Sequence, residues 1–184
     1  MMRQPQHNPP WRPGRSGGRA AGVGFLPTTL ILAVGNTLLG DEGAGVHAAR
    51  RLAELAGDRP GVELLDGGTL SFTLLPRLEA HDRLSVLDAA ELGAAPGAVR
   101  CFESAGMDAF LGQPRRSAHE VGLCDLMDMA RLAGHLPGHR ALVGIQPGPV
   151  EWSDTPSEAV SAALDHAART ALELLDRWDA GVAG

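Results

Sequence analysis

The sequence predicts an α/β fold, a three-layer α/β/α sandwich around a mostly parallel, twisted sheet of about five strands. Short runs that are apolar at almost every position alternate with longer segments in which apolar residues recur at helical spacing. A run without polar alternation is typical of a strand buried on both faces. Strands that alternate with helices form parallel sheets, because each crossover helix carries the chain back to the end of the sheet where the previous strand began.

Five segments are expected to form the strands. The first, TLILAV, ends at the turn formers Gly35 and Asn36, and the third, LSVLD, is apolar up to its final aspartate. Short runs bounded by turn residues suit strands rather than helices. The predicted strands cover residues 29–34, 62–65, 84–88, 98–103 and 141–145.

Helices are expected in the segments between these strands. Residues 42–56 place small and apolar side chains on one face at helical spacing. A second helix is expected through Leu74 and Leu78, with Pro76 near its start, where proline is tolerated.

Two further helices open with capping boxes, which satisfy the unpaired N–H groups of a first turn. They are Ser117–Glu120 and Thr155–Glu158, the second with Pro156 suited to the first helical position. We expect these helices to end near Gly134 and near Trp178.

The chain divides into a leader and one domain. Residues 1–28 are rich in Arg, Pro and Gly, show no periodicity and are expected to be disordered. The single predicted domain covers residues 29–184. All 16 basic residues are Arg; four lie in the acid-free leader, which leaves 12 Arg against 22 acids, a charge of −10, on the rest. That charge disfavours nucleic acid as a partner and suits a cation or a basic peptide segment.

Cysteine usage and hydropathy indicate the compartment. Cys101 and Cys124 cannot form a disulfide framework, so we expect a reducing, cytoplasmic environment. The apolar run after the Arg-rich start is broken by Pro27 and lacks a persuasive cleavage site. No run is long enough to span a membrane, so no membrane association is expected.

Polar residues gather at the predicted carboxyl ends of the strands. Ligands of open α/β sheets bind outside this edge, so a site is expected there. We expect the substrate-contacting residues to be Gly35, Asn36, Asp66, Gly67, Gly68, Thr69 and Gln146.

Asp41 and Glu42 stand beside glycines at the start of the first predicted helix. They are either charges that stabilise a helix N-terminus or ligands aimed into a crevice. Gly43 and Gly45 would each cost a helix about 1 kcal/mol relative to Ala. We therefore expect close approach of another chain or a ligand at these glycines.

Asp88 and His119 are the other candidates. Asp88 ends an apolar strand, where it serves either as a loop hydrogen-bonder or as a site residue. His119 stands near the N-terminus of a helix, whose dipole favours the neutral, metal-binding imidazole, although a surface histidine fits as well. If these two converge with Glu42, they form a site for a divalent transition metal with open positions. The sequence has no H-E-x-x-H motif and no phosphate-binding glycine loop after a strand.

Five motifs in order resemble the hydrogenase maturation endopeptidases, which process the large subunit of nickel–iron hydrogenases. The resemblance covers about residues 30–178. Its motifs are GNTLLGDEGAGV at 35–46, DGGT at 66–69, VLDA at 86–89, HEVGL at 119–123 and GIQP at 144–147.

The resemblance implies an α/β/α fold and an activity. Members of this family remove a C-terminal extension from the large-subunit precursor after nickel has been inserted, as endopeptidases of the aspartic type. By motif, the metal-sensing and catalytic residues are Glu42, Asp88 and His119, with Asp41 as a candidate base. The implied partner is the nickel-loaded precursor, and the nickel comes with it, so the free enzyme is expected to be metal-free. We expect a monomer.

The sequence departs from the family pattern at two positions, and it is compatible with three other functions. Ser71 replaces an expected glycine after DGGT, and Pro156 replaces a leucine. A hydrolase similar to peptidyl-tRNA hydrolase would also place Asn, Asp and His near strand ends, but the acidic body disfavours tRNA. A non-enzymatic metal-binding module would keep metal in the free protein. A nucleotide-binding domain would need the missing phosphate loop.

Overall fold

The computed structural model describes residues 27–69, 72–113 and 118–181. The expected disordered leader therefore lies outside the described residues, apart from its last two positions. Thr28, the last of these, donates from its backbone nitrogen and its hydroxyl to the Asp82 carboxylate, at 2.8 and 3.0 Å. Within the described ranges, no helix is both long and apolar enough to cross a membrane.

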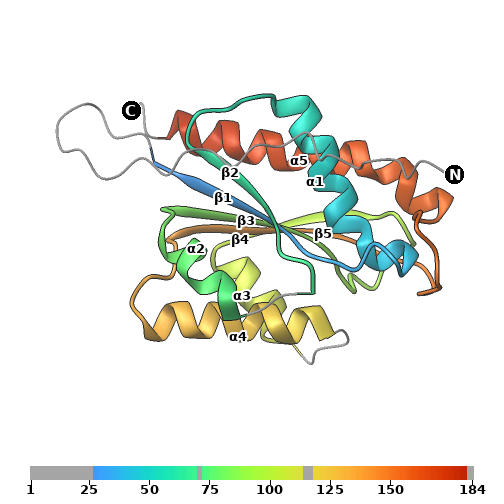
Figure 1. Ribbon diagram of the computed structural model, residues 1–184, viewed down its shortest axis with the longest axis horizontal. Helices are drawn as coiled ribbons and strands as arrows, with labels where there is room; N and C mark the ends of the chain where they lie inside the picture. The colour runs from blue at the N-terminus through green and yellow to red at the C-terminus, as the bar shows by residue number, and fades with distance from the viewer. Residues whose placement is uncertain (1–26, 70–71, 114–117, 182–184) are drawn as a thin grey trace, which may run out of the picture.

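Five strands form one sheet in the order β2-β1-β3-β5-β4 (Figure 1). β1, β2, β3 and β5 pair in parallel, and β4 pairs antiparallel with β5. The strands are β1 (Thr29–Ala33), β2 (Val62–Asp66), β3 (Arg83–Ala89), β4 (Val99–Glu103) and β5 (His139–Ile145). Each lies within two residues of its predicted bounds, and the mostly parallel sheet is confirmed.

Burial along the strands explains the apolar runs. Every residue of β1 and β3 is buried, because neighbouring strands flank them and helices cover both faces. β4 is an edge strand with partly exposed residues. It runs antiparallel to β5 because the connection from β3, residues 90–98, contains no crossover helix. The chain therefore enters β4 at the end of the sheet where it leaves β3.

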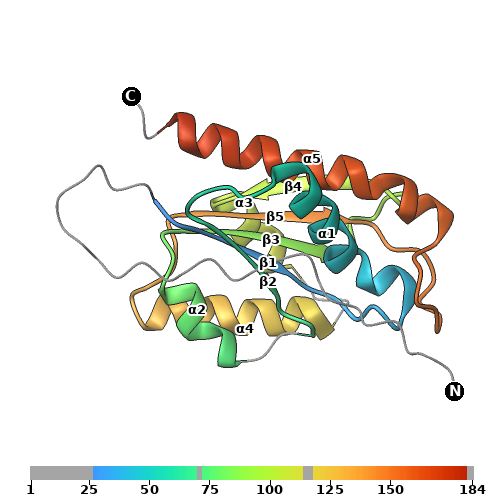
Figure 2. The same ribbon diagram turned by 45° about the horizontal axis from the view of Figure 1, so that its top comes forward.

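Helices cover both faces of the sheet, which confirms the three-layer sandwich (Figures 1 and 2). One face carries α1 and α5, and the other carries α2, α3 and α4. The helices are α1 (Ala44–Ala56), α2 (Leu75–Glu79), α3 (Ala105–Leu111), α4 (Ala118–Leu132) and α5 (Glu158–Ala180). Two 3₁₀ turns precede α1 and α2: η1 (Gly40–Gly43) and η2 (Phe72–Leu74).

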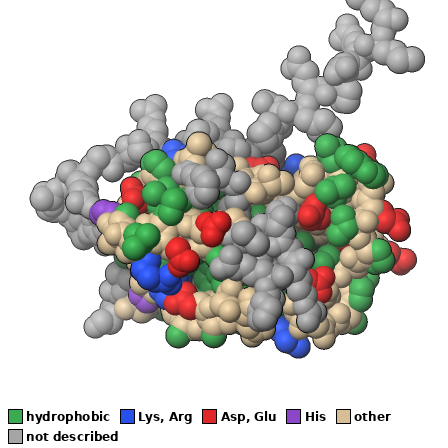
Figure 3. Space-filling model, turned by 90° about the horizontal axis from the view of Figure 1, so that it is seen from below, with side chains coloured by type: hydrophobic (Ala, Val, Ile, Leu, Met, Phe, Trp, Pro, Cys, Tyr) green, Lys and Arg blue, Asp and Glu red, His purple; other side chains and the backbone are tan. Residues whose placement is uncertain are grey.

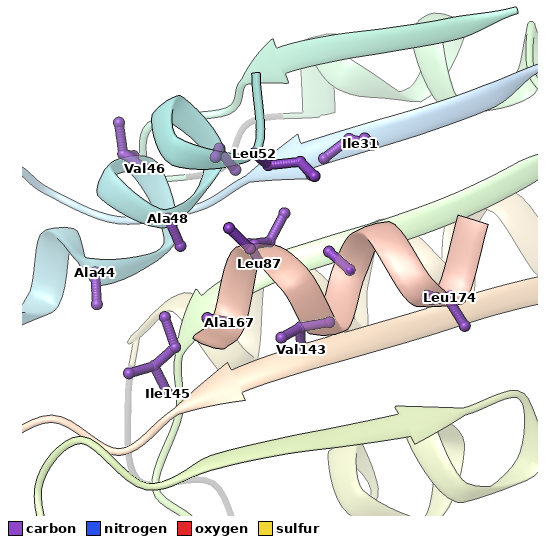
Figure 4. Packing of buried hydrophobic residues seen from close by; sticks show 14 of the residues in the cluster. Ile31, Ala44, Val46, Ala48, Leu52, Leu87, Val143, Ile145, Ala167 and Leu174 are labelled. Atoms are coloured by element: carbon purple, nitrogen blue, oxygen red, sulfur yellow. The ribbon is translucent and has the colours of Figure 1, made fainter. Parts of the chain in front are cut away.

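Each face of the sheet has its own apolar core, because successive strand residues point to opposite faces. Toward α1 and α5, Leu87 and Val143 pack with Leu52 and Leu174 (Figure 4). On the face covered by α2, α3 and α4, the strands contribute Leu30, Val86 and Leu142, among others, to the second core. Burial of each such leucine or valine contributes about 1.5–3 kcal/mol.

The helices differ from the predictions at three points. The segment 42–56 begins as the η1 turn, and α1 starts only at Ala44. α3 was not predicted, because its two buried residues, Met107 and Leu111, are too few to show periodicity. α5 is capped by Ser157, whose hydroxyl accepts from the Val160 nitrogen, rather than by Thr155. The other predicted cap, Ser117, lies outside the described residues.

A fully buried arginine joins the sheet to the end of α5. Arg83, 2% exposed, opens β3. Its guanidinium donates to the Asp179 carboxylate at 2.7 Å and to the Trp178 carbonyl at 2.9 Å. These bonds satisfy a charge that would be costly to bury alone.

Candidate active site

The carboxyl ends of the four parallel strands lie at one edge of the sheet, at the right of Figure 1. The loops that leave this edge are residues 34–43, 67–71, 90–98 and 146–157, of which 70 and 71 lie outside the described part. The predicted site residues Gly35, Asp66, Asp88 and Gln146 all lie at this edge, as the motif positions led us to expect.

Glycine at position 45 lets the start of α1 reach the strand ends. A Cβ at Gly45 would lie 2.2 Å from the Leu87 carbonyl oxygen and 2.4 Å from that of Val34. The first turn of α1 is thus wedged between the ends of β1 and β3. Our expectation of a ligand or a second chain at this glycine was wrong, because the close neighbour is the protein's own backbone.

Glycine at position 35 allows the backbone of Glu42 to approach closely. It has a φ of +144°, and a Cβ here would lie 2.3 Å from the Glu42 carbonyl oxygen. The Gly35 nitrogen donates to the Gly68 carbonyl at 2.8 Å, which joins the loop after β2 to the same spot. Gly35 therefore joins the loop after β2 to the turn that carries Glu42.

Glu42 and Asp88 lie on elements that contact each other. Glu42 is half-buried in η1, and Asp88 is the penultimate residue of β3, where it is 1% exposed and pairs in register with Gly144. η1 packs against β3. The structure therefore brings these two carboxylates to one edge, although they are 46 positions apart in the sequence.

His119 lies in the first turn of α4, and its side chain is outside the part of the chain that the structure describes. The first turn of α4 is at the same end of the molecule as the carboxyl edge (Figure 1). Among the described side chains, no group of three or more His, Cys, Asp and Glu is arranged to hold a metal ion. The predicted three-ligand set thus stays a prediction.

Asp41 has a different environment from Glu42. It is 1% exposed, and its carboxylate accepts from the Gly148 nitrogen at 2.8 Å and from the Ser157 nitrogen and hydroxyl at 2.6 and 2.9 Å. A carboxylate at the start of α5 also interacts favourably with the helix dipole. These bonds occupy Asp41 inside the protein, so the geometry favours a structural role over that of a general base.

Gln146 also makes internal contacts. Its side-chain oxygen accepts from the Leu92 and Ala94 nitrogens at 2.8 and 3.3 Å, and its amide donates to the Pro147 carbonyl at 3.1 Å. It is 5% exposed. Gln146 therefore orders the loop after β3, and its contact with substrate stays a prediction.

Two other predicted substrate contacts form local turns. The Asn36 side-chain oxygen accepts from the Leu38 nitrogen at 3.0 Å, and the Asp66 carboxylate accepts from the Gly68 nitrogen at 2.9 Å. Such bonds are typical of Asx turns. Both residues shape the loops at the edge, and their contact with substrate stays a prediction, as does that of Thr69.

Neither cysteine belongs to this edge. Cys101 lies on β4, where burial, with a smaller effect from Glu103, raises the pKa of its thiol to about 11. It is therefore protonated at neutral pH and a poor nucleophile. Cys124 is buried in α4 and donates to the Leu111 carbonyl. Neither thiol is therefore a candidate nucleophile at this edge.

Sequence reasoning missed Ser157 and Gly148, the two donors that hold Asp41. It also missed Leu38 and Trp152, two exposed apolar residues on the adjoining loops. The available signal was the Trp in EWSD, a large apolar side chain in an otherwise polar turn.

Comparison with known proteins gives this edge a context. A sequence model described as hydrogenase maturation protease matches residues 46–174. The hydrogenase expression/formation protein HupD of Rhodobacter capsulatus is 37% identical over 150 residues, which are 81% of this chain and 71% of that protein. The hydrogenase 2 maturation protease of Escherichia coli is 32% identical over 147 residues, covering 79% and 89%.

Solved structures show the same fold. The hydrogenase maturating endopeptidase HybD from E. coli has a TM-score of 0.74 and 30% identity, over 82% of this chain and 93% of that one. The [NiFe] hydrogenase maturation protease HybD from Thermococcus kodakarensis has a TM-score of 0.68 and 31% identity, over 80% and 98%. With the acidic edge, these likenesses define a peptidase. The chain belongs to the hydrogenase maturation protease family.

Proposed function

We propose that this protease removes the C-terminal extension of a nickel–iron hydrogenase large-subunit precursor once nickel has been inserted. The substrate's nickel is recognised by Glu42, Asp88 and His119. The observation that carries the proposal is the placement of Glu42 and Asp88 on two contacting elements at the carboxyl edge. The first turn of α4, with His119, is at the same end of the molecule.

The donor set suits the task. Two carboxylates and one imidazole bind a divalent transition metal and leave coordination positions for the precursor's own ligands. Nickel is thus cargo of the substrate, and the free protease is proposed to carry none. The carboxylates make the enzyme an endopeptidase of the aspartic type in this proposal.

Rate acceleration follows from position. Ligation of the precursor's nickel would hold the adjacent scissile bond against the edge, so that attack by water becomes an intramolecular event. The bound metal would also polarise the carbonyl or lower the pKa of a water. A precursor without nickel lacks this anchor and is left uncut.

The surroundings of the reaction are part of the proposal. We propose that a monomer acts in the cytoplasm, without nucleic acid or membrane. The charge of −10 on residues 29–184 and a count of two cysteines, too few for a disulfide framework, support this setting.

The test is intact mass spectrometry of a matching precursor, nickel-loaded or nickel-free, after incubation with the protease. Loss of a C-terminal fragment from the loaded form alone is the expected result. Cleavage of both forms would keep the peptidase and discard the nickel gate. Cleavage of neither form would discard the substrate.

A further inference from the structure

Three apolar side chains are exposed on the loops beside the candidate site. Leu38 is 59% exposed, Val150 56% and Trp152 83%. We call these three residues the Leu38–Trp152 surface. Single exposed leucines are ordinary, but an exposed tryptophan beside other apolar residues is typical of a binding surface, where Trp is enriched at the centre.

Backbone hydrogen bonds hold this surface in place. Leu39 and Ser153 form a parallel bridge, in which the Gly40 nitrogen donates to the Ser153 carbonyl at 2.8 Å and the Ser153 nitrogen to the Leu38 carbonyl at 3.1 Å. Leu38 and Trp152 each precede a bridged residue, so they occupy equivalent positions in the two paired segments. The hydrogen-bonded backbone therefore fixes the position at which Trp152 is exposed.

The surface is continuous with the candidate site. The Glu42 nitrogen donates to the Leu39 carbonyl at 3.3 Å, so Leu38 and Glu42 belong to one folded turn. Asp41, bonded to Gly148 and Ser157, joins this turn to both ends of the loop that carries Trp152. A polypeptide bound at Glu42 would therefore lie at the same edge as the three apolar side chains.

Charge narrows the kind of partner. The sequence segments 35–49 and 146–158 contain no Lys or Arg, and exposed Glu151 and Asp154 flank Trp152. At the right-hand end of Figure 3, hydrophobic and acidic side chains lie side by side. Such a surface complements a segment that combines apolar with basic side chains.

We propose that the Leu38–Trp152 surface docks the stretch of the large-subunit precursor that adjoins the scissile bond, through an apolar side chain flanked by basic ones. This inference rests on the proposed function, because the occupant is that function's substrate. It adds a second anchor, independent of nickel, which aligns the peptide across the edge.

The test compares Trp152→Ala with Leu132→Ala, using the full chain and nickel-loaded precursor. Leu132 is a matched control, because it is 88% exposed at the far end of α4. Loss of a docking tryptophan should raise KM about tenfold and leave kcat within about twofold. Leu132→Ala should keep both constants. Thermal unfolding of each variant should match wild type, because neither side chain is buried.

A second comparison tests the acidic flank. Glu151→Gln combined with Asp154→Asn should lower kcat/KM about threefold at low salt, and the difference should shrink at high salt. An equal loss at all salt concentrations would contradict the assigned charge complementarity.

Several outcomes would overturn the docking proposal. They are an unchanged KM in Trp152→Ala, a loss confined to kcat, or an equal loss in Leu132→Ala. Sedimentation that shows a dimer dissolved by Trp152→Ala, with KM unchanged, would assign the surface to a second copy instead. If wild type cuts no precursor, the proposed function fails, and calorimetric titration with precursor decides the docking surface separately. Binding lost with Trp152→Ala would then still support it.

Discussion

Asp41 and Ser157 are joined by two hydrogen bonds across 116 positions of sequence, from the serine nitrogen at 2.6 Å and its hydroxyl at 2.9 Å. The same serine hydroxyl caps α5 by accepting from the Val160 nitrogen. One buried carboxylate thus connects the turn that carries Glu42 to the start of the longest helix. This connection sets the position of the candidate site relative to the core.

Replacement of Asp41 by Ala should destabilise the protein by about 2–3 kcal/mol, because the Gly148 and Ser157 nitrogens would lose their acceptor. Asp41→Asn should cost less, because its amide oxygen can still accept. Urea unfolding measures the free energy of unfolding of both variants. Asp82 is exposed but unsuitable as a control site, because its carboxylate accepts a hydrogen bond from Thr28. Asp58→Ala, on an exposed loop, is the suitable control. Equal stability of Asp41→Ala and Asp58→Ala would contradict the structural role.

Glu42→Gln, Asp88→Asn and His119→Ala should each abolish processing of the nickel-loaded precursor. Each change removes a proposed metal ligand. Glu42→Gln and Asp88→Asn also keep nearly the same side-chain volume. Mass spectrometry of the precursor measures the activity, and circular dichroism checks the fold. His135→Ala, an exposed histidine just after α4, should remain active. Full activity in any of the three variants would remove that residue from the site.

Gly45→Ala should destabilise the protein by about 2 kcal/mol or more, because the new Cβ would overlap the Leu87 and Val34 carbonyl oxygens. Gly106→Ala is the matched control in α3, where a Cβ meets nothing within 4 Å. That change should be neutral or stabilising by up to about 1 kcal/mol, since alanine favours a helix. Thermal unfolding of both variants makes the comparison. Similar shifts in Tm would contradict this account, because they would show that α1 can move away from the strand ends at little cost.

Acid should weaken the attachment of α3 to β5. The hydrogen bond from Arg140 is the main cause that lowers the pKa of Asp108 below its ordinary value of 3.8. The folded pKa lies below the unfolded one, so the stabilisation is fully present above pH 3.8 and is lost as pH falls through the folded pKa. Unfolding measured between neutral pH and pH 2 should therefore show a shallower acid loss in Asp108→Asn than in wild type. Parallel curves would contradict this account.

The strands and the edge were predictable from local pattern. β1 and β3 read as continuous apolar runs because both of their faces are buried, and a polar residue at the end of such a run marks the carboxyl edge. The placement of Glu42 and Asp88 at one edge follows from this parallel topology alone. Ser157 instead of Thr155 as the cap of α5 did not follow, because both residues can cap a helix and the choice depends on Asp41.

By itself, the sequence determined the α/β class, the parallel strands, their common edge and the family motifs, because each depends on residues close together in the chain. Only the tertiary structure decided which polar residues face inward. Asp41 meets Ser157, Gln146 meets Leu92, and Gly45 meets Leu87, all across 42 or more positions. Such pairings depend on how elements pack, and packing brings together groups whose chemistry leaves no local pattern. The same packing left Trp152 in solvent beside the site.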